Sequence, residues 1–277
     1  MNEPLVPGLH IVATPIGNLG DLSPRAADTL RRANRILVED TRVTAKLLAH
    51  IGAKVPMTRY DDHTSEGERA AIVGRLGEEA IALVSDAGTP LISDPGFKLV
   101  RAARAAGHDV HTVPGPSAAI AALTLAGLPT DRFLFLGFLP AKAKARGDAI
   151  AEIAGVRATL VIYESGPRLG DTLAALAGHL GARDGAVARE ISKLHEECVT
   201  GSLDELAKRY ADAAPKGEIV IVVGPPPESA GASEEELDAA LDTAMVDLSP
   251  SRAAALVAEQ LNIPRKRAYA RALERSK

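Results

Sequence analysis

The chain has 277 residues, of which 46% are hydrophobic and 25% charged, so its length predicts two domains and its composition excludes disorder throughout. Aromatic residues make up only 3%, which argues against the stacking platforms that bind single-stranded nucleic acid. The net charge of -4 is unevenly spread: residues 251–277 carry seven basic and two acidic residues, whereas acidic residues outnumber basic ones by nine in residues 1–250. This reversal marks a separate basic tail.

Short β-branched runs alternate with helical patterns through the first half of the chain. The predicted strands are residues 9–14, 35–40, 55–60, 80–86 and 109–115. The predicted helices are residues 23–33, 41–52, 65–78, 95–107 and 117–127. Ser23 followed by Pro24 is typical of a helix start. This alternation predicts a mainly parallel sheet with helices on both faces.

A second cycle of strands begins after the segment GLPTD at residues 127–131, where we place a domain boundary. Its predicted strands are residues 132–140, 158–165, 186–201 and 217–224. Three prolines, Pro225 to Pro227, end this cycle. The predicted domains are therefore an N-terminal α/β domain over 1–127 and a C-terminal α/β domain over 128–225.

The last part of the chain divides by charge. Residues 226–248 are predicted to be an acidic linker and helix, because 228–247 hold seven acidic residues and no basic one. Residues 249–277 are predicted to be a basic tail like a helix-turn-helix, with two helices separated by a turn at Asn262 and Pro264. No apolar run approaches the ~20 residues that span a membrane. Since the first residues also lack the pattern of an export signal, we expect a cytoplasmic location and no membrane attachment.

Four loops after the predicted strands of the first half are candidates for ligand binding. They are ATPIGN at 13–18, EDTR at 39–42, SDAGTPLISDPG at 85–96 and VPGPSAA at 113–119. In an open α/β sheet such loops gather at the edge where ligands bind. No GxGxxG or GxxxxGK[ST] pattern occurs, so a ligand without phosphates is favoured. Asp86 and Asp94 in these loops can accept hydrogen bonds or face a cation.

Other constellations predict little chemistry. His108 and His111 flank a helix end and a strand, and a single cysteine, Cys198, excludes a disulfide or a four-cysteine zinc site and fits a reducing cytosol. We therefore expect no metal. His195 and Cys198 lie in a strand-like segment, where side chains three apart face opposite ways, so no covalent nucleophile is predicted. The polar run from Arg189 to Glu196 is either surface pairing or one wall of a site.

Taken together, these loops resemble one known family. The runs VATPIGNLGD, EDTR, VSDAGTPLISDPG, LPTDRF, FLGFLPAK, YES and ARE occur in the order and spacing of the bacterial ribosomal RNA small subunit methyltransferase I family, over nearly all of the chain. The resemblance implies two α/β domains of the tetrapyrrole methylase type with a cofactor cleft between them, plus a small C-terminal helical module. It also implies a homodimer that uses S-adenosylmethionine to methylate the ribose 2'-hydroxyl of cytidine 1402 in 16S rRNA of the 30S subunit.

The resemblance also assigns site residues. The implied cofactor contacts are Pro15, Ile16, Asp86, Ala87, Gly88, Ser117, Ala118, Tyr163, Ala188 and Glu218. A sulfonium cation suits an apolar, partly anionic pocket of this kind. The predicted acceptor site is lined by Glu39, Asp40, Arg42, Arg189, Glu190, Lys193 and Glu196. An acidic residue would take the proton and the basic residues would hold phosphates. The alternative explanation of EDTR is an ordinary helix cap by Asp40 among surface charges.

Two other functions stay open from the sequence. The first is methylation of a tetrapyrrole or another small molecule, against which the first loop lacks the GxGPG pattern of the porphyrin methylases. The second is a non-enzymatic nucleic-acid-binding protein, which leaves residues 85–96 unexplained. We favour an enzyme whose tail binds rRNA phosphates through its second helix. The predicted RNA-binding residues are Arg265, Lys266, Arg267 and Arg271.

Overall fold

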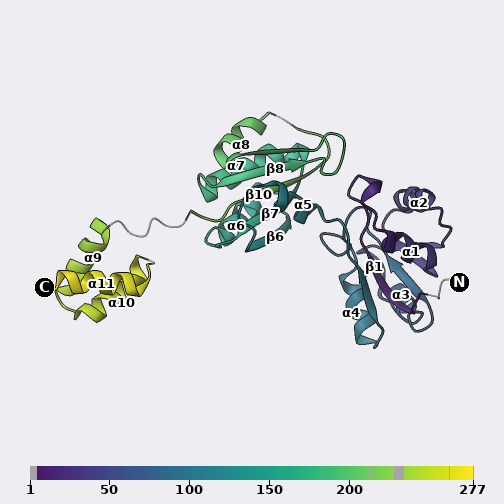
Figure 1. The fold of residues 1–277 in the computed structure, drawn as a ribbon, viewed down its shortest axis with the longest axis horizontal. Helices are drawn as coiled ribbons and strands as arrows, with labels where there is room; N and C mark the ends of the chain where they lie inside the picture. Colours follow the sequence, from purple (N-terminus) through teal and green to yellow (C-terminus); the bar gives the residue numbers. More distant parts are fainter. Residues whose placement is uncertain (1–4, 213, 228–233, 262, 277) are drawn as a thin grey trace. The chain divides into compact units, whose positions relative to one another are not determined.

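A computed structural model describes residues 5–212, 214–227, 234–261 and 263–276 of the chain (Figure 1). It divides the chain into two compact units, Met1–Pro225 and Pro226–Lys277. The predicted turn residue Asn262 lies outside the described residues. No helix among the described residues is long and apolar enough to cross a membrane.

The first sheet has five parallel strands. They are β1 (Gly8–Val12), β2 (Arg35–Val38), β3 (Met57–Arg59), β4 (Ala80–Leu83) and β5 (Val110–Val113). Their order is β3-β2-β4-β1-β5, and every neighbouring pair is parallel. All four residues of β4 are buried, as expected for the central strand of a sheet covered on both faces. The predicted parallel sheet is confirmed.

Helices cover both faces of this sheet. They are α1 (Pro24–Arg32), α2 (Thr41–His50), α3 (Glu66–Val73) and α4 (Phe97–Ala105), with a short 3-10 turn, η1 (Leu19–Asp21). Leu30 and Leu47 of α1 and α2 pack with Val38 on one side, whereas Ile72 and Leu99 of α3 and α4 pack on the other. Side-chain caps fix the starts of α1, α2 and α3 within one residue of the predicted positions: for α1, the Ser23 side chain accepts a hydrogen bond from the Ala26 amide.

The second sheet is mixed, and here one predicted strand is wrong. Its strands are β6 (Phe133–Phe138), β7 (Thr159–Ser165), β8 (Asp184–Arg189), β9 (Glu197–Ser202) and β10 (Glu218–Val223), in the order β6-β7-β10-β8-β9. Only β6 and β7 are parallel. The predicted strand over 186–201 is instead two antiparallel strands joined by residues 190–196. The chain turns there because Glu190 and Ser192 adopt left-handed backbone angles, which no glycine or proline announces.

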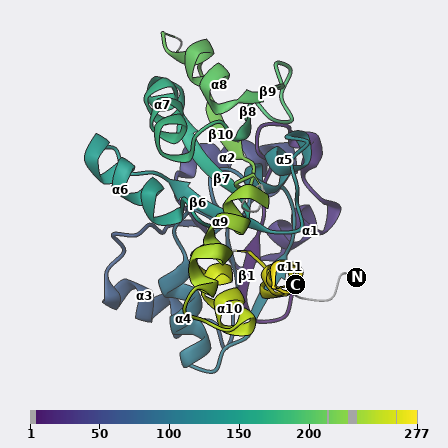
Figure 2. The same ribbon diagram turned by 90° about the vertical axis from the view of Figure 1, so that its left-hand side faces the viewer.

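Four helices pack on the second sheet. They are α5 (Ala118–Leu125), α6 (Ala143–Ile153), α7 (Leu169–Leu180) and α8 (Leu203–Tyr210), with a 3-10 turn, η2 (Gly166–Arg168), before α7. The last three share one core, and α7 and α8 lie side by side (Figure 2). Helix α5 packs on the other face, where Ala122 and Leu123 contact the layer of Val161 and Val220. The sequence places α5 in the first domain, but its apolar face belongs to the core of the second sheet.

A buried carboxylate lies at the end of β7. Glu164 is 2% exposed and accepts hydrogen bonds from the Thr172 hydroxyl at 2.6 Å and from the Ser165 amide at 2.8 Å. The guanidinium of Arg168 lies 3.3 Å from the same carboxylate. A hydrogen bond to a buried charged group contributes more to stability than one between neutral groups. If the bond is lost, the buried charge has no water to replace the donor.

Replacing Thr172 by valine is therefore expected to destabilise the protein. The substitution keeps the side-chain shape but removes the donor, so the free energy of unfolding should fall by about 1.5–3 kcal/mol, measured by urea denaturation. Thr172→Ser, which keeps the hydroxyl, is the matched control and should lose less. A valine variant as stable as the wild type would show that the Thr172 hydroxyl contributes nothing to stability.

The described residues of the C-terminal unit form three helices around one core. They are α9 (Glu234–Met245), α10 (Pro250–Gln260) and α11 (Arg265–Arg275). Leu237 and Leu241 of α9 pack with Val257 of α10 and with Ala268 and Ala272 of α11. The acidic helix, which the sequence analysis assigned to a linker segment, thus shares a core with the two basic helices, because its leucines recur at helical spacing.

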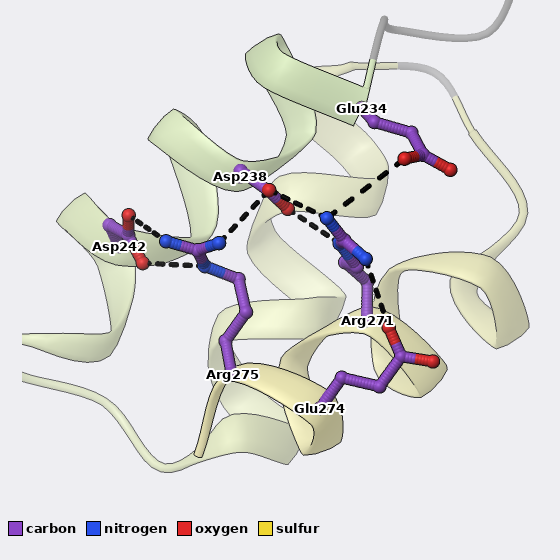
Figure 3. A network of polar contacts seen from close by, with 6 residues as sticks. All are labelled: Glu234, Asp238, Asp242, Arg271, Glu274 and Arg275. Carbon is purple, nitrogen blue, oxygen red and sulfur yellow. Dashed lines mark hydrogen bonds and ion pairs between the residues drawn. The ribbon is translucent and has the colours of Figure 1, made fainter. Parts of the chain in front are cut away.

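Ion pairs join α9 to α11 (Figure 3). The Asp238 carboxylate accepts hydrogen bonds from Arg271 at 2.7 Å and from Arg275 at 2.9 Å, and Arg275 also donates to Asp242 at 2.8 Å. Arg271 lowers the pKa of Asp238, and Glu274 is a further partner of Arg271 at 3.0 Å. The positive charge of the predicted tail is thus partly neutralised within its own unit.

Candidate functional site

The loops after β1, β4 and β5 are hydrogen-bonded to one another. Thr14 and Gly88 exchange backbone hydrogen bonds of 2.8 and 3.1 Å, and the Thr89 hydroxyl donates to the Pro116 carbonyl at 2.9 Å. Three of the four loops singled out from the sequence therefore form one continuous rim at the carboxyl edge of the first sheet. This edge is where open α/β sheets bind ligands.

A first hollow lies beside this rim and is open to solvent. Both sheets contribute to its wall. The predicted cofactor residues that line it are Ile16, Ala87, Gly88, Ser117, Ala118, Tyr163 and Glu218. The Tyr163 hydroxyl accepts a hydrogen bond from the Ala119 amide at 3.2 Å, which ties β7 to the start of α5. The structure thus brings seven of the ten predicted contacts to one wall.

The charge of the first hollow is one-sided. Asp94, Glu164 and Glu218 line it, and none of its described lining residues is basic. Its other walls are small or apolar, including Ala118 and Val220. Such a lining suits a cationic, partly apolar ligand and offers no basic side chain to a phosphate group.

The other three predicted cofactor residues lie elsewhere. Pro15 and Asp86 line a second hollow, described below. Ala188 is fully buried on β8, opposite Val220 of β10, and lines neither hollow. The Ala188 side chain is part of the core beneath the site, so a contact of this residue with the cofactor stays a prediction.

Several residues of the first hollow were not predicted from the sequence. They are Thr89, Ile92, Ser93, Asp94, Phe138, Glu164, Ile219 and Val220. Asp94 could have been found, because it ends the conspicuous run SDAGTPLISDPG. Phe138 could not, because it follows a register shift between Phe135 and Gly137 that no residue pattern predicts.

The loop over residues 85–96 is held in a strained conformation. Leu91 and Ser93 both have left-handed backbone angles, at φ of 74° and 64°, which cost about 1–3 kcal/mol each in non-glycine residues. Gly96, at φ 139°, is required because a Cβ there would lie 2.8 Å from the Leu83 side chain. Strain of this kind is concentrated at functional sites, and here it fixes the position of Asp94.

Acidic residues surround Asp94. Burial and the negative charges of Glu39, Asp86 and Glu218 together raise its pKa to about 6, although a hydrogen bond with Ser85 acts in the opposite direction. The pKa of Glu39 is also raised, first by burial and then by the charge of Asp86. The repulsion among these groups makes the site favourable for a cation.

A second hollow of about 1000 Å³ adjoins the first, because Ile16, Ala87 and Glu218 line both. Its charged residues include Asp86 and two lysines, Lys46 and Lys193. Acidic and basic groups therefore face one space, unlike in the first hollow. This arrangement suits a ligand that carries phosphate groups beside a reacting hydroxyl.

Lys193 reaches this hollow from the loop between β8 and β9. Its aliphatic stem lies over Gly17, where a Cβ would come within 2.4 Å of the Lys193 Cε atom. Its ammonium group pairs with Glu190 at 3.0 Å, and the neighbouring Ser192 hydroxyl donates to Asp21 of the first loop region. These contacts pin a loop of the second sheet to a loop of the first.

The remaining predicted acceptor residues form separate pairs. Asp40 caps α2 through the Arg42 amide at 2.8 Å and pairs with the Arg42 guanidinium at 2.5 Å, which lowers the pKa of Asp40 to about 2. Arg189 pairs with Glu197 across the β8–β9 hairpin. Among the seven predicted residues, only Lys193 lines either hollow. The structure does not gather the other six into one wall: Glu39, Asp40, Arg42, Arg189, Glu190 and Glu196.

The EDTR run still adjoins the site. The Asp40 amide donates a hydrogen bond to the Asp86 carboxylate at 3.1 Å, so the start of α2 is tied to the wall of the second hollow. Among the described residues, no group of three or more histidine, cysteine or carboxylate side chains has the arrangement of a metal site.

Comparison with protein families matches both units of the chain. Residues 8–207 match the model described as Tetrapyrrole (Corrin/Porphyrin) Methylases, and residues 231–276 match the RsmI C-terminal HTH domain. A protein of Erythrobacter litoralis named ribosomal RNA small subunit methyltransferase I is 54% identical over 98% of this chain and 96% of its own length. A protein of the same name from Xylella fastidiosa is 49% identical over 94% of this chain and 97% of its own length.

Solved structures show the same fold at low identity. Diphthine synthase aligns with a TM-score of 0.61 and 14% identity, over 78% of this chain and 90% of its own. Uroporphyrin-III C-methyltransferase from Thermus thermophilus, complexed with S-adenosyl homocysteine, aligns with a TM-score of 0.53 and 22% identity, over 78% of this chain and 97% of its own. At these identities the likeness concerns the fold alone.

Proposed function

Because this chain belongs to the tetrapyrrole methylases and, within them, to the ribosomal RNA small subunit methyltransferase I family, we propose how its two hollows divide the reaction. The enzyme uses S-adenosylmethionine to methylate the ribose 2'-hydroxyl of a cytidine in 16S rRNA, cytidine 1402. The first hollow holds the cofactor, and the second receives the RNA nucleotide. The shared wall of Ile16, Ala87 and Glu218 is where the two ligands meet.

The one-sided charge of the first hollow carries this proposal. S-adenosylmethionine is a cation with an apolar adenosine part and no phosphate, and the lining of Asp94, Glu164 and Glu218 among small and apolar residues matches it. A nucleotide cofactor would instead need basic or amide-rich phosphate contacts. When bound, the cofactor supplies an activated methyl group, so the protein has to align the acceptor and remove one proton.

The second hollow supplies positive charges that can pair with the phosphates of RNA. Lys193 and Lys46 can hold phosphates next to the target ribose, and Arg42 and Arg189 lie on the elements beside them. Glu190 and Glu196 hold the Lys193 loop in place: Glu190 pairs with Lys193, and Glu196 accepts a hydrogen bond from the Ser192 amide at 2.7 Å. Asp40 is unsuited to proton abstraction, because a carboxylate whose pKa is about 2 is a weak base.

The proposal is tested by methyl transfer from labelled S-adenosylmethionine to assembled 30S subunits and to naked 16S rRNA in parallel, followed by mapping of the labelled nucleotide. We propose that the assembled subunit is the substrate, so label should appear at one cytidine of the subunit and much less on naked rRNA. Label on a different nucleotide, or on neither RNA, would contradict the proposal.

The helical unit is proposed to bind RNA phosphates through one end of α11. Arg265 and Lys266 form a small surface pocket with Ser251 and Tyr269, and neither has an ion pair among the described residues. Arg267 lies next to them on the same turn. Arg271 differs, because its guanidinium already binds Asp238 and Glu274. Arg271 therefore joins α9 to α11, and its contact with RNA stays a prediction.

Replacing Arg265 and Lys266 together by alanine is expected to weaken RNA binding without changing cofactor affinity. Loss of two phosphate contacts should reduce the slope of log affinity against log salt by about 1.4–1.8, measured by filter binding to 30S subunits over a salt series. The matched control is Lys208 and Arg209, two consecutive basic residues of α8. Their double alanine variant should keep the slope. An unchanged slope in the first variant would place the RNA contacts elsewhere.

We also propose a homodimer in the cytoplasm. Apolar residues are exposed near the site: Phe138, which lines the first hollow, is 57% exposed, and Leu194 beside Lys193 is 93% exposed. A second copy that covered them would remove apolar surface from water and close the cofactor hollow. Light scattering on the purified protein should give the mass of two chains, and the mass of one chain would contradict the dimer.

A further inference from the structure

A groove separate from the two hollows lies between α3 and α4, which are side by side on one face of the first sheet (Figure 2). It shares no lining residue with either hollow. Small side chains, among them Ala70, Ala102 and Ala105, make up much of its lining. Its lysine and arginine lining residues are Arg69, Lys98 and Arg101, and its one acidic lining residue is Glu66.

Helix α4 carries three basic residues and no acidic one. Lys98, Arg101 and Arg104 recur at every third position, so they lie on one face of the helix, and all three are exposed. The stripe is roughly 9 Å long at 1.5 Å per helical residue. Within the described part of the chain, none of the three has an ion pair. In α11, by contrast, carboxylates of α9 neutralise Arg271 and Arg275.

Neutral groups hold two of the cations in place at this groove. The Arg101 guanidinium lies over the Phe97 ring, 5.7 Å from its centroid, and this cation-π contact orients the charge without cancelling it. On the α3 side, Arg69 donates a hydrogen bond to the Thr64 carbonyl at 3.3 Å. The groove therefore presents oriented positive charges from both of its helices.

The groove begins at the edge of the sheet where the hollows lie. Phe97 is the first residue of α4 and directly follows the loop over residues 85–96. Ser93 and Asp94 of that loop line the first hollow. A chain bound in the groove can therefore continue from there toward the ligand edge.

We infer that the groove between α3 and α4 binds backbone phosphates of the rRNA outside the target nucleotide, an inference that rests on the proposed function. Lys98, Arg101 and Arg104 each contact a phosphate. Successive phosphates of one strand are about 3.4 Å apart along a duplex axis, so the stripe spans two to three of them. Contacts of this kind position the RNA and read no sequence.

The charge of the stripe favours RNA over a second copy of this chain as the occupant. The exposed Phe97 ring, at 65%, would by itself suit a contact between copies. In a two-fold symmetric contact, however, the same patch of both copies meets. Lys98, Arg101 and Arg104 would then face their own counterparts, and like charges repel.

The test is filter binding to 30S subunits over a salt series, with Lys98→Gln and Arg101→Gln combined in one variant. Loss of two phosphate contacts should lower the slope of log affinity against log salt by about 1.4–1.8. The affinity should then be about twentyfold lower at 0.15 M salt and should approach that of the wild type near 1 M. Lys98→Arg combined with Arg101→Lys keeps both charges and should keep the slope. Calorimetry should give an unchanged affinity for S-adenosylhomocysteine.

The matched control removes two other positive charges. Lys54, between α2 and β3, and Arg157, before β7, are exposed and line neither the hollows nor this groove. Within the described residues, neither has an ion pair. Lys54→Gln combined with Arg157→Gln changes the net charge by the same amount as the test variant. This control should keep the wild-type slope.

The other outcomes contradict the inference in distinguishable ways. An unchanged slope in the Lys98 and Arg101 variant, or an equal fall in the control, means that the groove binds no phosphates. A change from two chains to one in light scattering of the test variant makes the groove an interface between copies. If the wild type transfers no methyl group to 30S subunits, the proposed function fails and the inference with it. If the double variant does not fold, Arg104→Gln should lower the slope by about 0.7–0.9, and an unchanged slope there overturns the inference.

Discussion

Replacement of Ala118 by phenylalanine is expected to weaken binding of S-adenosylhomocysteine about a hundredfold, which corresponds to about 2.7 kcal/mol. Ala118 is the first residue of α5 and lines the first hollow. A phenyl ring at this position would fill space that the proposed cofactor needs. It would also lie beside the Tyr163 hydroxyl, which accepts a hydrogen bond from the next amide along the helix. Titration calorimetry measures the affinity directly, without RNA or turnover.

Ile120 of the same helix provides the matched control. It is 47% exposed and lines neither hollow, so Ile120→Phe introduces the same side chain on the solvent side of α5. This variant should bind S-adenosylhomocysteine as the wild type does, and both variants should unfold at similar temperatures. If Ala118→Phe bound the ligand normally, the cofactor would not occupy the first hollow.

The first sheet and its ligand edge could be predicted from the sequence because their signals are local. Strands such as 80–86 are continuous apolar runs, and Ser23 with Pro24 marks a helix start. The rim of loops follows from the rule that parallel strands end at one edge, and it brings Gly88 and Ser117 to one hollow. Local patterns were therefore enough to predict the fold where neighbouring strands run parallel and helices connect them.

What the sequence did not disclose depends on contacts between distant segments. The hairpin at 190–196 rests on left-handed angles at Glu190 and Ser192, which side-chain type does not predict. Arg271 was expected to bind RNA, but Asp238 lies 33 positions earlier and only the packing of α9 on α11 brings the two together. The raised pKa of Asp94 likewise arises from burial and from the charges of Glu39 and Glu218, which only the fold brings near it.

Removing the charge of Lys193 is expected to lower kcat/KM for RNA about 30-fold, or about 2 kcal/mol, with cofactor affinity unchanged. Lys193→Met keeps the aliphatic stem that lies over Gly17, so the loop should stay in place and only the ammonium group is lost. If that group holds a phosphate beside the target ribose, the salt slope of RNA binding should also fall by about 0.7–0.9. Single-turnover kinetics and filter binding on 30S subunits measure the two effects.

The matched control is Lys144 on α6, which tests whether the loss of any paired lysine has the same effect. It also pairs with a carboxylate, Asp148 at 2.9 Å, but it is exposed and lines neither hollow. Lys144→Met should therefore leave kcat/KM and the salt slope unchanged. A Lys193→Met enzyme with the same kinetics as Lys144→Met would mean that Lys193 only pins the two loops together through Glu190 and Gly17. In that case Lys46, the other lysine of the second hollow, would be the remaining candidate there for the phosphate contact.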